Sequence, residues 1–270
     1  MNTLSNWFDL IMVQIGLLPF VVSLISILIF RRWIPKHTSL SIPLGWLAAV
    51  LSITTISFFP ETAAQKVILL CLLATPIGLC LNSNSLDGPI RRVTFGLLIT
   101  GALLWSFSGI YSQLSGTDLL IRGICGWAFI HWTLRNLDTQ RKHAMRSSVA
   151  VLALALGIAA AAAQSSVLIS HLSLAMAFSV AAFLVCACFL ANMRSTAVLS
   201  FAAGLGLALL AYAAVIQNEI IWYALIPFVL VPLVAKIPLP QKQPIWLQAS
   251  ILLLCCGVVS SGGFLLDRFT

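Results

Sequence analysis

The sequence predicts an all-α fold, a polytopic transmembrane helix bundle of about ten spans, on two observations. First, 60% of the residues are hydrophobic and only 8% are charged, whereas soluble globular proteins carry about 25% charged residues. Second, Lys and Arg lie in five clusters, separated by apolar stretches of roughly 40 to 55 residues, each long enough for two crossings of about 20 residues. Each stretch is therefore expected to form a membrane hairpin.

The five clusters predict how the spans are oriented. Short cytoplasmic loops are enriched in Lys and Arg, so we expect all five clusters on the cytoplasmic face and both chain termini on the other face. Only Lys66, Arg122 and Arg268 lie outside the clusters. The clusters are Arg31, Arg32 and Lys36; Arg91 and Arg92; Arg135, Arg141, Lys142 and Arg146; Arg194; and Lys236 and Lys242.

The first apolar run, residues 7–30, precedes Arg31 and Arg32. A secretory signal peptide has the opposite order, a basic start followed by a shorter apolar region, so this run is expected to remain as the first span. Polar turns at 60–65 and 112–118 then separate the members of later hairpins. The second to fifth spans are expected at 40–59, 65–82, 92–112 and 119–135.

The second half of the chain follows the same logic. Arg146 and Arg194 must share one face, so the chain between them has to cross twice. We expect its turn near Ser170 to Ser173, with His171 as a turn residue. Small residues concentrate in the sixth and eighth spans, which predicts that these two are central, because small side chains let helices approach closely. The sixth to tenth spans are expected at 148–167, 172–192, 197–216, 220–236 and 246–266.

No loop is long enough for a separate domain, so residues 1–270 are expected to form a single integral membrane domain. A division into halves, 1–146 and 147–270, would give five spans each and an inverted repeat of the kind found in many transporters. This division is a hypothesis that the prolines do not favour. Those in spans of the first half are Pro19, Pro43 and Pro76, and those of the second half are Pro227 and Pro232, both in span nine.

The sequence shows no arrangement of residues for catalysis. It has no Ser-His-Asp set, no paired carboxylates on one helical face and no HExxH motif, so an enzyme acting on lipids has no catalytic group to rest on. We assign no catalytic, cofactor-binding or metal-binding residue. The seven cysteines, mostly within predicted spans, do not describe a disulfide framework. The net charge of +8 lies mainly in short loops, where membrane lipids rather than nucleic acid are the expected partners.

Span nine is the best candidate for lining a cavity. Pro227 and Pro232 each remove an N–H donor and free a carbonyl one turn earlier, those of Tyr223 and Phe228, so the span is expected to kink or break. Freed carbonyls within a membrane need protein or a water-filled cavity around them; the alternative is a kink that only improves packing. The candidate cavity-lining residues are Pro227, Pro232, Tyr223, Trp105 and Gln14.

Span five holds the ionisable residues nearest to the membrane interior, and they form a candidate polar gate. Asp118 and Arg122 are four residues apart on one helical face, and His131 lies further along the span. The alternative for Arg122 is a side chain that extends to the headgroups and pairs with Asp118. The alternative for His131 is a hydrogen-bonded packing residue, because it has no second metal ligand one turn away.

Two functions fit these observations. The first is a transporter or permease-like protein of a bacterial inner membrane, for a small neutral or amphipathic solute, lipid-linked solutes included; scarce charge within the spans disfavours ion-coupled transport. The second is a noncatalytic membrane subunit or assembly factor of a larger complex, which needs packing surfaces and no pathway. Its partners would be other membrane subunits.

Overall fold

The computed structural model describes residues 10–54, 62–81, 89–113, 115–140, 143–190, 193, 196–217, 220–239 and 243–268. Every regular element in these ranges is a helix, as the sequence predicts. The elements are η1 (Val13–Leu17), α2 (Leu18–Trp33), η2 (Pro35–Leu40), α3 (Ser41–Ile53), α4 (Ala63–Leu81), α5 (Pro89–Tyr111), α6 (Gly116–Thr139), α7 (Ala144–Ala162), α8 (Val167–Phe189), η3 (Leu199–Ala203), α9 (Gly204–Ile216), η4 (Trp222–Ala224), α10 (Leu225–Val234) and α11 (Ile245–Arg268).

Seven helices in the described part of the chain are long and apolar enough to cross a membrane, which indicates an integral membrane protein. Two further segments are apolar but shorter, α3 with 13 residues and Trp222–Val234. The helix α6 is long but contains Asp118, Arg122, Arg135 and Asp138. The seven long apolar helices are Leu10–Trp33, Ala63–Leu81, Val93–Tyr111, Ala144–Ala162, Val167–Phe189, Leu199–Ile216 and Ile245–Leu266.

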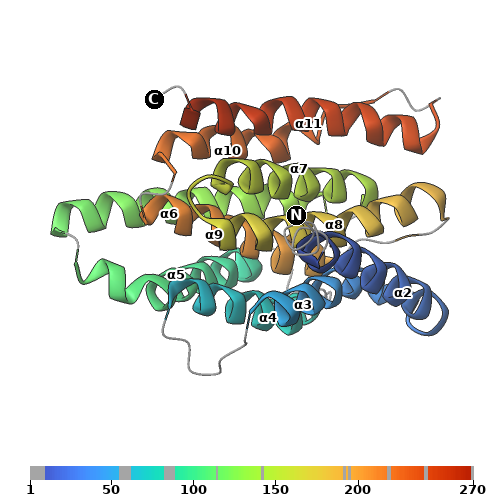
Figure 1. Ribbon diagram of the computed structural model, residues 1–270, viewed down its shortest axis with the longest axis horizontal. Coiled ribbons are helices and arrows are strands. Elements are labelled where there is room, and N and C mark those ends of the chain that lie inside the picture. The colour runs from blue at the N-terminus through green and yellow to red at the C-terminus, as the bar shows by residue number, and fades with distance from the viewer. Residues whose placement is uncertain are drawn as a thin grey trace, which may run out of the picture.

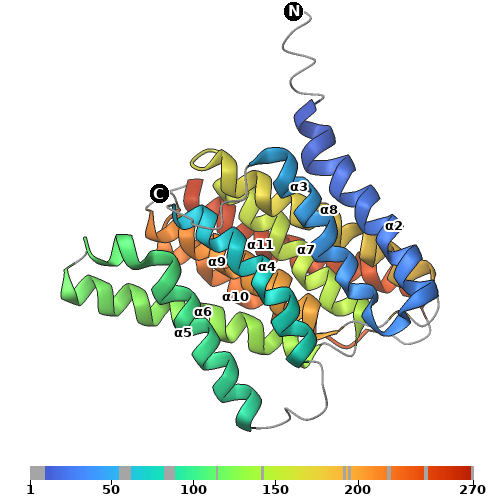
Figure 2. The ribbon, with the colours of Figure 1, turned by 90° about the horizontal axis from the view of Figure 1, so that it is seen from below.

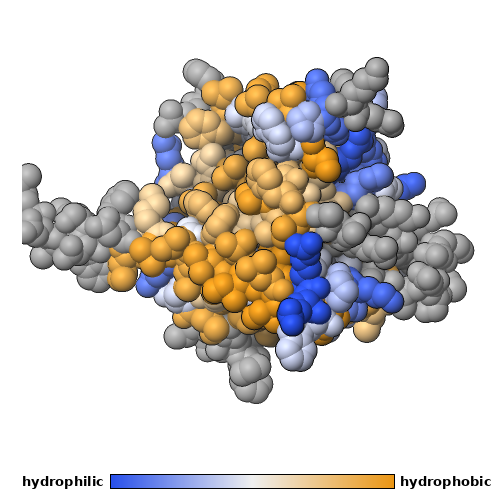
Figure 3. All heavy atoms as spheres, turned by 90° about the vertical axis from the view of Figure 1, so that its right-hand side faces the viewer, coloured by the Kyte–Doolittle hydropathy of each residue, from blue (hydrophilic) through white to orange (hydrophobic). Residues whose placement is uncertain are grey.

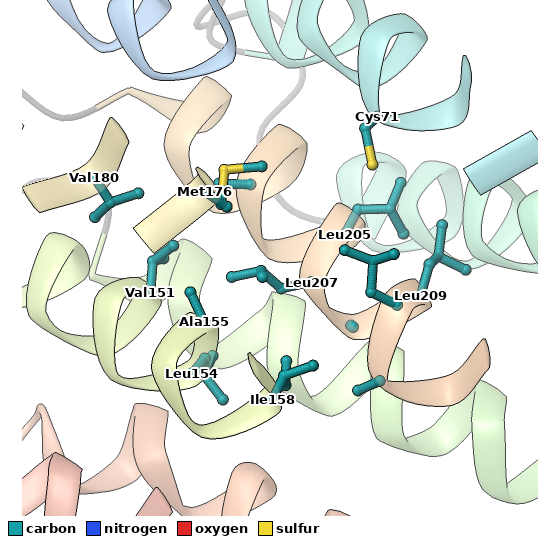
Figure 4. Packing of buried hydrophobic residues seen from close by; sticks show 14 of the residues in the cluster. Cys71, Val151, Leu154, Ala155, Ile158, Met176, Val180, Leu205, Leu207 and Leu209 are labelled. Atoms are coloured by element: carbon teal, nitrogen blue, oxygen red, sulfur yellow. The ribbon is translucent and has the colours of Figure 1, made fainter. Parts of the chain in front are cut away.

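The helices α7, α8 and α9 form the middle of the bundle, with α10 and α11 on one side and α2 to α5 on the other (Figure 1). The small residues of α7 and α9 explain this position, because they allow close approach on every side, and both helices are buried along most of their length. Figure 4 shows the result: Leu207 of α9 lies between Met176 of α8 and the pair Leu154 and Ile158 of α7, all within one hydrophobic core. The predicted central position of these two spans is confirmed.

The turn between α7 and α8 corrects the sequence prediction. It lies at 163–166 rather than near Ser170 to Ser173, so His171 is a residue of α8 and not of a turn. Serine is tolerated inside this helix because a neighbouring helix satisfies its hydroxyl: Ser170 Oγ donates to the carbonyl of Ala159 on α7 at 2.9 Å. Consequently α7 ends at Ala162 rather than at 167, and α8 begins at Val167 rather than at 172.

The prolines shape the helices in different ways. Pro19 follows a π-helical turn, η1, in which the N–H of Leu18 bonds the carbonyl of Val13; the missing N–H of the proline removes the α-helical bond at this point. In span nine a 3₁₀ turn, η4, precedes α10, with Pro227 in the first turn of α10 and Pro232 inside it. The helical run from Trp222 to Val234 is continuous and changes from 3₁₀ to α at Leu225, so the kink or break expected from the two prolines stays a prediction.

Glycines seat α10 against its neighbours. Phe228 is fully buried, and a Cβ on Gly263 of α11 would lie 2.8 Å from its ring, while one on Gly157 of α7 would lie 2.9 Å from it. Pro227 lies against Gly262 of α11. The glycines Gly157, Gly262 and Gly263 thus leave room for α10 between α7 and α11, and we call this space the α10 slot.

Four of the basic turns come together in pairs at one end of the bundle, which we call the basic end. Arg146 Nη1 donates to the carbonyl of Lys236 at 3.3 Å, which joins the third and fifth clusters. Ser39, which follows the first cluster, is hydrogen-bonded to Thr196, which follows the fourth. Six basic side chains of the clusters are not among the described ones: Arg91, Arg92, Arg141, Lys142, Arg194 and Lys242. Figure 3 looks onto this end, where hydrophilic groups lie between hydrophobic ones.

At the opposite end, α5 and the first half of α6 form a hairpin that stands away from the rest of the bundle (Figure 2). A Cβ on Gly101, Gly109 or Gly123 would meet no other atom within 4 Å. Lys66 of α4 reaches the hairpin, where its Nζ donates to Ser108 Oγ at 3.3 Å.

Candidate functional site

A cavity of about 430 Å³ lies at the end opposite to the basic end, between α6, the last turns of α9 and the η4–α10 segment. We call it the Tyr212 cavity. Its volume is within the range of small-molecule sites, about 300–1,000 Å³. Its walls are mainly apolar, and its charged lining residues are Asp118 and Arg122. The apolar lining includes Ile121, Val215, Ile216, Ile221 and Leu225.

The first turns of α6 supply the charged groups. Ser115 caps the helix: its Oγ accepts from the backbone N–H of Asp118 at 3.3 Å and donates to the Asp118 carboxylate at 2.8 Å. A carboxylate in the first turn is favourable there because the helix N-terminus carries partial positive charge. Arg122 follows one turn later, half-buried, so that the cavity has one negative and one positive group on the same wall.

Tyr212 of α9 forms the inner surface of the cavity and is buried. Its hydroxyl donates to the carbonyl of Arg122 at 3.0 Å and is 3.1 Å from the hydroxyl of Tyr111 on α5. Its ring lies against Gly126 of α6, where a Cβ would clash with it, and meets Phe107 edge-on with centroids 5.1 Å apart. Hydrogen bonds and packing therefore fix α5, α6 and α9 around one side chain.

The opposite wall is the η4–α10 segment that the sequence singled out. Trp222 and Leu225 line the cavity, and the Trp222 indole is 66% exposed, as expected of an aromatic residue at a membrane interface. The 3₁₀ turn before α10 turns this indole toward the cavity and packs it edge-on against Tyr223, with centroids 5.8 Å apart. An apolar site with a charged wall and an indole at its margin suits an amphipathic ligand.

The structure brings only part of the predicted site together. Asp118 and Arg122 share the cavity, whereas His131 lies beyond it, stacked on Trp127 with centroids 4.7 Å apart. None of the five predicted cavity-lining residues lines the Tyr212 cavity, and their role stays a prediction. Pro227 and Pro232 are buried in helix packing, Tyr223 contacts Trp222, Trp105 is exposed on α5, and Gln14 is half-buried in η1.

Sequence reasoning missed Tyr212, Trp222 and Gly126 as parts of one site. A weak signal existed for Tyr212, since it is one of three tyrosines in the chain and stands alone among Ala, Leu and Gly residues. Among the described residues no group of three or more His, Cys, Asp or Glu side chains could hold a metal ion.

Comparison of the chain with models of protein families finds no match, and comparison with curated proteins finds none either. The fold and the site nevertheless define a class: an integral membrane protein of apolar helices with a ligand-sized cavity among them.

Proposed function

We propose that the chain crosses a bacterial inner membrane ten times, with the basic end in the cytoplasm and both termini outside. The contacts between Arg146 and Lys236 and between Ser39 and Thr196 support this, because they join turns that the basic bias assigns to one face. The short helix α3 would cover about 20 Å, and η2, which leads directly into it, extends the crossing. The charged residues of α6 all lie near its ends, which leaves an apolar centre.

We further propose that the protein is a transporter or permease-like protein for a small neutral or amphipathic solute, lipid-linked solutes included. The Tyr212 cavity is the observation that carries this proposal. Its apolar walls would take the apolar part of the solute, and Asp118 with Arg122 would take a polar part without net charge. The packed core between α7, α8 and α9 has few charged groups, which supports facilitated movement rather than ion coupling.

The test uses a zwitterionic amphiphile, fluorescent short-chain phosphatidylcholine carrying the NBD group, in vesicles that contain the purified protein. Dithionite added outside bleaches only probe molecules in the outer leaflet, so bleaching of inner-leaflet probe reports transfer. We expect the wild-type protein to increase this transfer. Val215→Phe, which fills the cavity from a partly exposed position on α9, is expected to reduce it.

Leu97→Phe is the matched control, because Leu97 is 69% exposed on α5 and is not among the lining residues of the cavity. It should transfer the probe as the wild type does. Transfer by the wild-type protein no faster than in protein-free vesicles, or equal transfer by Val215→Phe, would contradict the proposal.

A second function, a noncatalytic subunit or assembly factor, is favoured by the α5–α6 hairpin. It stands off the bundle, and Gly101 and Gly109 leave its surface open to the close approach of another helix (Figure 2). Purification in a mild detergent separates the two functions. Membrane subunits that co-purify stoichiometrically with the wild type, and are lost from the Gly101→Leu variant, would favour the subunit function. Purification of the wild type as a monomer or homodimer would favour the transporter function.

A further inference from the structure

A second cavity, of about 570 Å³, lies at the basic end, between the first turn of α7, the end of α8 and the start of α11. We call it the Arg146 cavity. Its polar lining residues are His143, Arg146 and Gln248, and its apolar ones include Leu190, Met193 and Ile245. No acidic residue is among the described residues that line it.

The Arg146 side chain is held by one hydrogen bond and has donors left for a ligand. Its Nη1 donates to the carbonyl of Lys236 at 3.3 Å, and among the described residues its guanidinium makes no other hydrogen bond. Since a guanidinium presents five donors in a planar fork, the remaining donors match the oxygens of a phosphate. His143 is exposed beside it, and the N-terminus of α7 adds a partial positive charge to the same wall.

The surroundings of the cavity are those of a membrane interface. Phe189, next to Leu190, is 73% exposed, and Trp246, next to Ile245, is 52% exposed. An exposed Trp at the start of a spanning helix is typical of the headgroup zone. Behind Arg146, the Nζ of Lys236 donates to Asn136 Oδ1 at 2.7 Å, which keeps a further cation at this end.

We propose that the Arg146 cavity binds an anionic phospholipid, with the phosphate held by Arg146 and His143 and the upper acyl chain against Leu190, Met193 and Ile245. A cationic group beside an apolar cleft at the end of a helix bundle recognises both parts of such a lipid. The inference does not depend on transport, since a scaffold would use the same site.

The test measures binding of phosphatidylglycerol to the full chain, delipidated in detergent, by native mass spectrometry and by the shift of its thermal unfolding midpoint. Phosphatidylcholine and inorganic phosphate are the comparison ligands. We expect phosphatidylglycerol to bind and to raise the midpoint more than either. The double variant Arg146→Gln, His143→Gln should bind it about tenfold more weakly.

Two further variants make the result decisive. Arg32→Gln removes an exposed arginine of the basic end that does not line the cavity and should bind normally. Ala187→Phe fills the cavity and keeps every charge, so it should weaken binding even if the double variant fails to fold. Undiminished binding by Ala187→Phe, or equal effects of inorganic phosphate and phosphatidylglycerol, would overturn the proposal.

Discussion

Gly126 is the residue on which the inner surface of the Tyr212 cavity depends. A Cβ at this position would clash with the Tyr212 ring, so Gly126→Ala must displace either the ring or α6. We expect a loss of about 1–3 kcal/mol in unfolding free energy, the usual cost of overpacking, measured by thermal unfolding in detergent. Gly123→Ala on the same helix meets no atom within 4 Å and should not lower stability. Equal effects of the two changes would contradict this packing.

The hydroxyls of Tyr212 and Tyr111 differ in the number of hydrogen bonds that they make. The Tyr212 hydroxyl contacts both the carbonyl of Arg122 and the hydroxyl of Tyr111, whereas the Tyr111 hydroxyl has the Tyr212 hydroxyl as its hydrogen-bond partner among the described residues. With about 1 kcal/mol for each hydrogen bond, Tyr212→Phe should destabilise the protein more than Tyr111→Phe does. Chemical unfolding of the two variants in parallel checks the order. A larger effect of Tyr111→Phe would place the dominant hydrogen bond elsewhere.

For single residues, the sequence identified the charged groups of the site but not the residues that pack around them. Asp118 and Arg122 were identified because charge within a span is costly and rarely accidental, and both line the cavity. Tyr212 could not be assigned, because its partners Arg122 and Tyr111 lie about 100 residues away and no local pattern records such a contact.

Among the elements, the length of the apolar stretches and the positions of the basic clusters predicted where helices lie but not where each one ends. Each predicted span overlaps a helical segment among the described residues, and seven helices there are long and apolar enough to cross a membrane, yet the turn between α7 and α8 was placed too late. The reason is physical: Ser170 is polar enough to mark a turn in the sequence, but in the bundle its hydroxyl donates to the carbonyl of Ala159 on the neighbouring helix. Pro76 likewise lies inside an uninterrupted α4.

The α10 slot gives a prediction about how α11 packs on α10. Gly263→Ala would bring a Cβ to 2.8 Å from the Phe228 ring and 2.9 Å from the carbonyl of Ala224, so α11 must move away from η4 and α10. We expect a lower unfolding midpoint and, because Trp222 and Leu225 line the Tyr212 cavity, weaker binding of the NBD-labelled phosphatidylcholine. Gly257→Ala, also on α11, has open space and serves as the control; it should change neither quantity.

For the whole molecule, composition was enough to predict a membrane-embedded helix bundle, and small residues were enough to predict its centre. The cavities were not predictable, because the walls of each combine stretches that are distant in the sequence: 118–126 with 212–225 in one, and 143–146, 187–193 and 245–248 in the other. The division into halves 1–146 and 147–270 stays a prediction. The structure adds that the two cavities lie at opposite ends, one beside Asp118 and Arg122 and the other beside Arg146 with no acidic residue among its described lining.

This arrangement depends on α6 crossing the membrane, which gives the last prediction. Gln113 precedes α6, Thr139 ends it, and Lys36 lies in the first basic turn; all three are exposed. With the seven native cysteines replaced, single cysteines at these positions would be labelled by an impermeant maleimide in intact cells and in inverted vesicles. We expect Gln113→Cys to react from outside, and Thr139→Cys and Lys36→Cys only from the cytoplasm. If Gln113→Cys and Thr139→Cys react from one side, α6 does not cross, and the two cavities cannot serve opposite faces of the membrane.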